Sequence, residues 1–74
     1  MKITKGKVKG VVVQLGAADI KKWEDAGGSG VVFRHKVMAE ARSFAMRKGI
    51  RSGYIDVYAP RSAGGWTAES ERID

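Results

Sequence analysis

The chain has 74 residues, the length of one small domain, and it contains no cysteine, so neither a disulfide nor a thiolate metal site can hold it together. Its 14 Lys and Arg residues outnumber its 8 Asp and Glu residues, and the formal net charge of +6 favours an anionic partner such as nucleic acid, an anionic membrane surface or an acidic protein. No apolar run approaches the ~18 residues of a membrane span, so we expect no membrane partner. The run Val11–Leu15 is also too short for a signal-peptide core, and we expect an unprocessed, cytoplasmic chain.

The charges are distributed unevenly along the sequence. Residues 1–9 carry four lysines and no acid, and the middle of the chain is also basic. Residues 69–74 instead carry Glu69, Glu71 and Asp74 against Arg72. We therefore predict one domain over residues 1–74, with a basic N-terminal arm (residues 1–9) and an acidic C-terminal tail (residues 69–74).

The first half of the chain predicts a strand and a short helix. Residues 7–15 contain consecutive valines, which are stiff at χ1 and favour a pleated strand. Residues 17–26 predict a helix of about two turns, because Ile20 and Trp23 lie three apart and share a face. Gly27 and Gly28 end this helix, and the segment 27–30 reads as a flexible joint.

A long amphipathic helix is predicted from about Val32 to Lys48, with Gly49 as its left-handed stop. Winding the sequence at 100° per residue gathers an apolar side: Phe33, Val37, Met38, Ala41, Phe44 and Ala45. The other side is polar: His35, Lys36, Glu40, Arg42, Ser43 and Arg47. Ala39 and Met46 lie among those polar residues and leave a small exposed apolar spot.

The last third of the chain predicts a hairpin. Residues 54–59 alternate in polarity like a half-buried strand, Pro60–Gly65 predicts a turn, and residues 66–73 predict a weaker final strand with Thr67, Glu69 and Glu71 on one face. The order is β-α-α-β-β. We predict an α+β fold in which about three strands pack against the long helix and a short helix, around a core of Val11, Val13, Phe33, Val37, Phe44, Ile55 and Val57.

Catalytic and metal-binding chemistry has little support in the sequence. His35 is the only histidine, and Arg34 and Lys36 flank it, so it lacks the carboxylate that would orient a catalytic base. Glu24 and Asp25 are adjacent on a predicted helix and point apart, and the Glu69/Glu71 pair lacks the further oxygen ligands that calcium needs. The glycines of residues 27–30 do not have the spacing of a phosphate-binding loop. We expect no enzyme activity, no metal, no cofactor and no small-molecule substrate.

Two modes of binding remain open. For nucleic acid, Arg42, Arg47, Lys48 and Arg51 would join the basic arm against phosphates, while Tyr54, Tyr58 and Trp66 would stack on bases. For assembly, the acidic tail of one subunit would meet the basic face of the next. The basic partner-binding surface that we predict is Lys5, Lys7, Lys9, Arg42, Arg47, Lys48 and Arg51. The predicted interface is Met46, Tyr54, Tyr58, Trp66, Glu69 and Glu71.

Residues 39–61 resemble part of the neck or tail-completion proteins of tailed phages. The resemblance rests on helix alanines four apart (Ala41 and Ala45), a basic loop at Gly49–Arg51, and Ser52-Gly53 before a strand. The proline that usually precedes the Ser/Thr-Gly pair is missing, and the chain is shorter than most members. The resemblance implies a virion component at the head–tail junction or in the capsid shell, without catalytic residues.

Our leading hypothesis from the sequence is a non-enzymatic assembly module, most consistent with a small phage virion component. Its partners would be copies of itself or other virion proteins, and it would be cytoplasmic before assembly and virion-bound afterwards. The alternative is a small basic accessory protein that binds nucleic acid.

Overall fold

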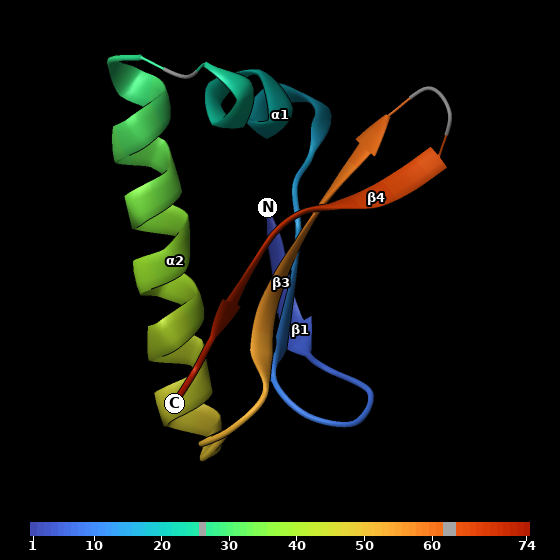
Figure 1. Ribbon diagram of the computed structural model, residues 1–74, viewed down its shortest axis with the longest axis vertical. Helices are drawn as coiled ribbons and strands as arrows, with labels where there is room; N and C mark the ends of the chain where they lie inside the picture. The colour runs from blue at the N-terminus through green and yellow to red at the C-terminus, as the bar shows by residue number, and fades with distance from the viewer. Residues whose placement is uncertain (26, 62–63) are drawn as a thin grey trace.

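A computed structural model describes the backbone of residues 1–25, 27–61 and 64–74, and the side chains of these residues apart from 60, 61 and 64–68. The elements are β1 (Lys2–Lys5), β2 (Val11–Gln14), α1 (Ala17–Glu24), α2 (Ser29–Lys48), β3 (Tyr54–Arg61) and β4 (Gly64–Arg72). The fold is α+β, as predicted, but the order is β-β-α-α-β-β (Figure 1).

Over the described residues the strands form one four-stranded mixed sheet in the order β1-β2-β3-β4. β1 pairs with β2 and β3 with β4 in antiparallel fashion, whereas β2 and β3 are parallel. Parallel neighbours need a crossover connection, and α1 and α2 supply it. Both helices therefore lie in the single connection between β2 and β3.

The prediction of about three strands was wrong because it missed β1. The segment "KITK" has one strongly apolar residue and is too short for its alternation to stand out. Pairing with β2 makes it a strand: Ile3 lies opposite Val13 and Lys5 opposite Val11. Two lysines on a short edge strand also discourage pairing with other chains. Four of the nine residues of the predicted basic arm are thus part of the sheet.

The two helices meet through a close backbone contact, which explains why α2 begins at Ser29 rather than at Val32. Gly30 is buried, and a Cβ atom there would lie 1.3 Å from the carbonyl oxygen of Asp25. The hydroxyl of Ser29 donates to the Asp25 carboxylate at 3.1 Å. The predicted flexible joint over residues 27–30 is therefore partly the first turn of α2. At the other end, Gly49 has φ +71°, which confirms it as the left-handed stop.

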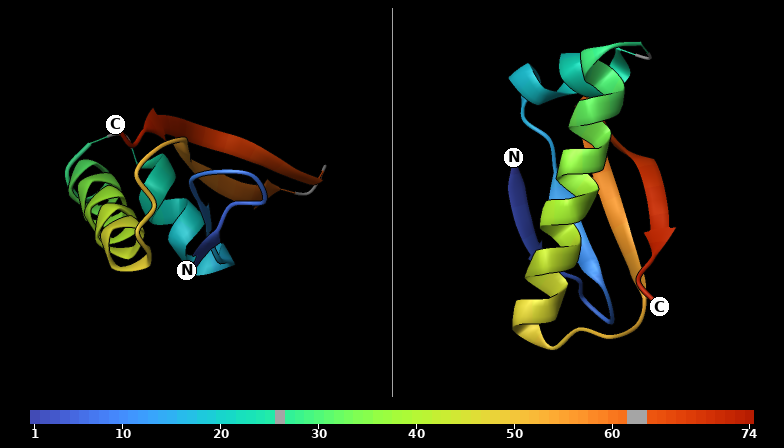
Figure 2. Two further views of the ribbon diagram at one scale, coloured as in Figure 1. Left: turned by 90° about the horizontal axis from the view of Figure 1, so that it is seen from below. Right: turned by 90° about the vertical axis from the view of Figure 1, so that its left-hand side faces the viewer.

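α2 lies along one face of the sheet (Figure 2), and the core lies between them. Of the predicted core, Val11, Val13, Val37, Ile55 and Val57 are fully buried, while two phenylalanines lie half-buried at its edge. The buried apolar residues are Val11, Val13, Leu15, Trp23, Val37, Met38, Ala41, Ala45, Ile55, Val57 and Ala59. The apolar side predicted for the long helix thus faces the sheet.

The β3–β4 hairpin runs past the end of β2. β2 pairs only with residues 55–58 of β3, whereas the β3–β4 ladder continues to Arg61 opposite Gly64 (Figure 1). A register shift between Val57 and Tyr58 interrupts the strict alternation that was predicted for the last strand. Of the predicted Pro60–Gly65 turn, residues 62–63 lie outside the described residues.

Candidate nucleic-acid interface

The face of the sheet opposite α2 has no helix over it in the described part of the chain (Figure 2). We call it the open face. On β3, Ile55 and Val57 point into the core, so the alternating residues Tyr54, Asp56 and Tyr58 belong to the open face. The Tyr54 side chain is 50% exposed, and the other two are half-buried. The sheet thus displays two tyrosines with a carboxylate between them.

The β1–β2 loop lies beside β3 because glycines allow the two backbones to approach closely. Gly10 has φ +83°, and a Cβ atom there would lie 2.2 Å from the carbonyl oxygen of Tyr54. Gly53 has φ +99°, and a Cβ atom on it would lie 2.8 Å from the backbone nitrogen of Gly10. This contact places the loop residues Val8 and Lys9 next to the tyrosines. Val8 itself is 89% exposed.

Two shallow hollows of similar size adjoin each other on the open face. One, of about 480 Å³, is lined by Tyr58, and the other, of about 430 Å³, by Tyr54. Val8, Lys9 and Asp56 line both of them. Each hollow is large enough for a small planar ligand. The hydroxyl of Ser70 on β4 donates to Asp56 Oδ1 at 2.7 Å and fixes the shared carboxylate.

A third hollow, of about 230 Å³, is lined by residues of β1 and the β1–β2 loop and by residues 48–52 at the end of α2 and after it. Figure 1 shows the β1–β2 loop and the C-terminal end of α2 at the same end of the molecule. Lys5, Lys9, Lys48 and Arg51 line this hollow, and none of its lining residues is acidic. We call these four residues the basic corner. The Lys48 ammonium also lies 5.8 Å from the centre of the Phe44 ring. Because Val8 and Lys9 line all three hollows, the basic corner is continuous with the open face.

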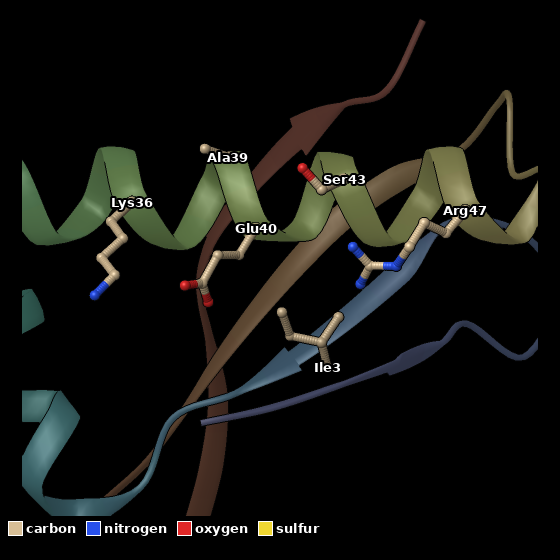
Figure 3. A pocket seen from close by; sticks show the side chains of 6 residues that line it. All are labelled: Ile3, Lys36, Ala39, Glu40, Ser43 and Arg47. Carbon is tan, nitrogen blue, oxygen red and sulfur yellow. The ribbon is translucent and has the colours of Figure 1, made fainter.

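Three of the seven predicted basic residues lie outside this corner. Lys7 lines the Tyr58 hollow on the open face. Arg47 lies on the other side of the sheet, in a hollow between α2 and β1. Figure 3 shows the Arg47 side chain directed toward Ile3, and the side chains of Glu40 and Lys36 extend from the same helix. Arg42 binds the C-terminal segment of its own chain.

The predicted acidic tail makes contacts within the chain. The Glu71 carboxylate accepts a hydrogen bond from Arg42, and Arg72 lies 3.5 Å from the Asp74 carboxylate. Glu69 is exposed on β4 and lines a hollow with Arg34, His35 and Arg42. These contacts occupy two of the three carboxylates that head-to-tail assembly would use.

Of the remaining predicted interface residues, Met46 does not lie with the tyrosines. Met46 is 81% exposed on α2, away from the open face. The side chain of Trp66 lies outside the described residues.

Among the residues that the structure describes, no group of three His, Asp or Glu side chains is arranged to hold a metal ion. In the same part of the chain, no helix is both long and apolar enough to cross a membrane.

The sequence pointed to the tyrosines and to all four cations of the basic corner but missed Val8, Asp56 and Ser70. The alternation of residues 54–59 already places Asp56 beside the tyrosines, so that signal was present. No signal in the sequence places the β1–β2 loop against β3, because the contact depends on Gly10 and Gly53 meeting across the fold. The chain matches no protein-family model, no curated protein and no solved structure.

Proposed function

We propose that the chain is a non-enzymatic module that binds single-stranded nucleic acid, with bases on the open face and phosphates at the basic corner. The observation that carries this proposal is the continuity of the two surfaces through Lys9. A strand of nucleic acid needs both kinds of contact side by side, because its bases and its phosphates alternate along the chain.

The stacking contribution comes from Tyr54 and Tyr58. Aromatic side chains on a sheet offer flat surfaces on which unpaired bases stack, for about 1–3 kcal/mol per base. Duplex bases are already stacked on each other, so the open face favours a single strand. The two tyrosines are four residues apart on β3, roughly 13 Å at about 3.3 Å per residue, which leaves room for a base between them.

The electrostatic contribution comes from the basic corner. Four cations line a hollow without a carboxylate, in a protein whose formal net charge is +6. Each phosphate that they neutralise releases counterions, so binding should weaken as salt rises. Two of the four, Lys5 and Lys9, come from the N-terminal segment, and Lys48 and Arg51 from the end of α2 and the segment after it. Folding brings them together.

The test is fluorescence anisotropy with a labelled twelve-nucleotide single strand. We expect the logarithm of the association constant to fall with the logarithm of salt concentration with a slope of about −2 to −3, for three or four phosphate contacts at about 0.7 each. Tyr54→Ala should weaken binding by about tenfold or more, whereas Met46→Ala, another exposed apolar residue, should leave it unchanged. Undetectable binding at 50 mM salt would reject the proposal.

A second candidate function is assembly through protein contacts, as in a small phage virion component. The extension of the β3–β4 hairpin past β2 favours it, because a two-stranded ribbon has two unpaired edges and is marginally stable without a neighbour. Its partners would be copies of this chain or other virion proteins. Sedimentation velocity across a hundredfold range of concentration tests it, with a variant in which a two-residue turn replaces residues 60–65. A monomer at every concentration, alone and with candidate partners, would reject this candidate.

A further inference from the structure

Asp56 is the one acidic residue that lines both tyrosine hollows. It lies two residues from each tyrosine on β3. In the Tyr58 hollow, the other charged residues are Lys7 and Lys9. A carboxylate in the middle of a phosphate-binding surface would repel the ligand. In a surface that holds bases at its centre and phosphates at its rim, the same carboxylate faces base edges instead.

The carboxylate is held in place and still has free acceptor sites. Ser70 donates to Asp56 Oδ1 at 2.7 Å across the β3–β4 pair, where the two residues lie directly opposite each other. An ionised carboxylate has about four lone-pair sites on two oxygens, and the serine uses one of them. Both carboxylate oxygens can therefore still accept hydrogen bonds. The donor would be the edge of a base that is stacked on a neighbouring tyrosine.

We propose, on the basis of the nucleic-acid function above, that Asp56 reads the Watson–Crick edge of a base and selects guanine. Guanine presents two adjacent donors, N1–H and the N2 amine, which match the two oxygens of one carboxylate. Adenine and cytosine present one amine beside a ring-nitrogen acceptor, and thymine and uracil present one N–H between two carbonyls. In each of those bases an acceptor atom would face one carboxylate oxygen. Two acceptors that face each other without a hydrogen between them are unfavourable when the base is buried or stacked.

The experiment compares four labelled twelve-nucleotide strands: oligothymidine, and the same strand with one central guanine, inosine or adenine. Inosine keeps N1–H and lacks the N2 amine, so it removes one of the two proposed bonds. We expect the guanine strand to bind about tenfold more tightly than oligothymidine, in line with the discrimination that a bidentate contact gives. The inosine strand should lose most of that gain, and the adenine strand should bind like oligothymidine.

The matched variant is Asp56→Asn, which keeps the shape and can still accept from Ser70. An amide presents one acceptor and one donor, so the guanine strand should lose its advantage and the adenine strand should gain. Thermal unfolding by circular dichroism checks that the variant is folded. Ser70→Ala, which keeps the carboxylate but frees its orientation, should reduce the guanine preference about threefold without abolishing binding.

The outcomes separate this inference from the function on which it rests. Binding of all four strands with equal affinity would overturn the selection of guanine and leave the binding function standing. An Asp56→Asn variant that binds every strand more tightly by the same factor would show that the carboxylate only repels phosphates, which also overturns the inference. Absence of binding to every strand would overturn both proposals, and concentration-dependent sedimentation would in that case support assembly through protein contacts.

Discussion

The guanidinium of Arg42, in the middle of α2, donates to the main-chain carbonyl of Ile73 at 3.2 Å, thirty-one residues further along the chain. The same group donates to the carbonyl of Arg72 at 3.0 Å and to the Glu71 carboxylate. The backbone N–H of Ile73 in turn donates to the Gly53 carbonyl at 3.0 Å. One side chain therefore fixes the C-terminal end of β4 to the helix that covers the sheet.

Replacing Arg42 with alanine should destabilise the fold. The loss of three hydrogen bonds, one of them to a partly exposed ion pair, should lower the free energy of unfolding by about 1–2 kcal/mol. Chemical denaturation measures this quantity. Arg47→Ala, which removes the same kind of side chain from an exposed position on the same helix, should change it by less than about 0.5 kcal/mol. Equal effects of the two substitutions would show that the hydrogen bonds from Arg42 to the C-terminal segment do not stabilise the fold.

Gly10→Ala should be strongly destabilising. Gly10 has positive φ and its Cβ position lies 2.2 Å from the Tyr54 carbonyl oxygen, so an alanine would have to separate the β1–β2 loop from β3. The strained backbone alone should cost about 1–3 kcal/mol, and the clash adds to it. Gly27→Ala is the control, because nothing lies within 4 Å of its Cβ position. Thermal unfolding should show a large drop for the first variant and little change for the second.

Charge reversal should distinguish the basic corner from the rest of the basic surface. Arg51→Glu and Arg47→Glu change the net charge equally, but only Arg51 lines the basic corner. We expect Arg51→Glu to weaken single-strand binding about tenfold and to reduce the magnitude of the salt slope by about 0.7, the loss of one phosphate contact. Arg47→Glu should weaken binding less than threefold. If both variants lost affinity equally, the total charge and not the corner would control binding.

Asp19 should make the stability of the protein sensitive to acid. The Met1 α-amine lies 3.0 Å from its carboxylate, and this ammonium is the main reason that the pKa of Asp19 lies below its usual range. A lowered pKa in the folded state stabilises the protein above the unfolded-state pKa of about 3.9, and that contribution disappears as the pH falls through the lower folded-state value.

Asp19→Asn, in protein with a free Met1 amine, should therefore lower the free energy of unfolding by about 0.5–1 kcal/mol at pH 7. The difference between the variant and the original protein should shrink as the pH falls below about 4. Urea denaturation at several pH values measures it. A difference that is constant from pH 7 to pH 2.5 would show that the ion pair contributes nothing.

The local sequence determined most of the secondary structure. α1, α2 with its stop at Gly49, and the strand at residues 54–59 follow from periodicity and glycine placement, because those signals depend on neighbouring residues alone. The five aliphatic residues of the predicted core were confirmed for the same reason. β1 escaped prediction because four residues carry too little pattern, and only its partner strand makes it regular.

The sequence by itself determined an α+β domain, its strong positive charge and the alternation that puts Tyr54 and Tyr58 on one face. The tertiary structure decided which charges act together. It separated Arg42 and Arg47 from the basic corner, occupied Glu71 with Arg42, and brought Lys5 and Lys9 to Lys48 and Arg51. These outcomes depend on contacts between residues far apart in the sequence, 29 positions in the case of Arg42 and Glu71, and no local propensity encodes such contacts.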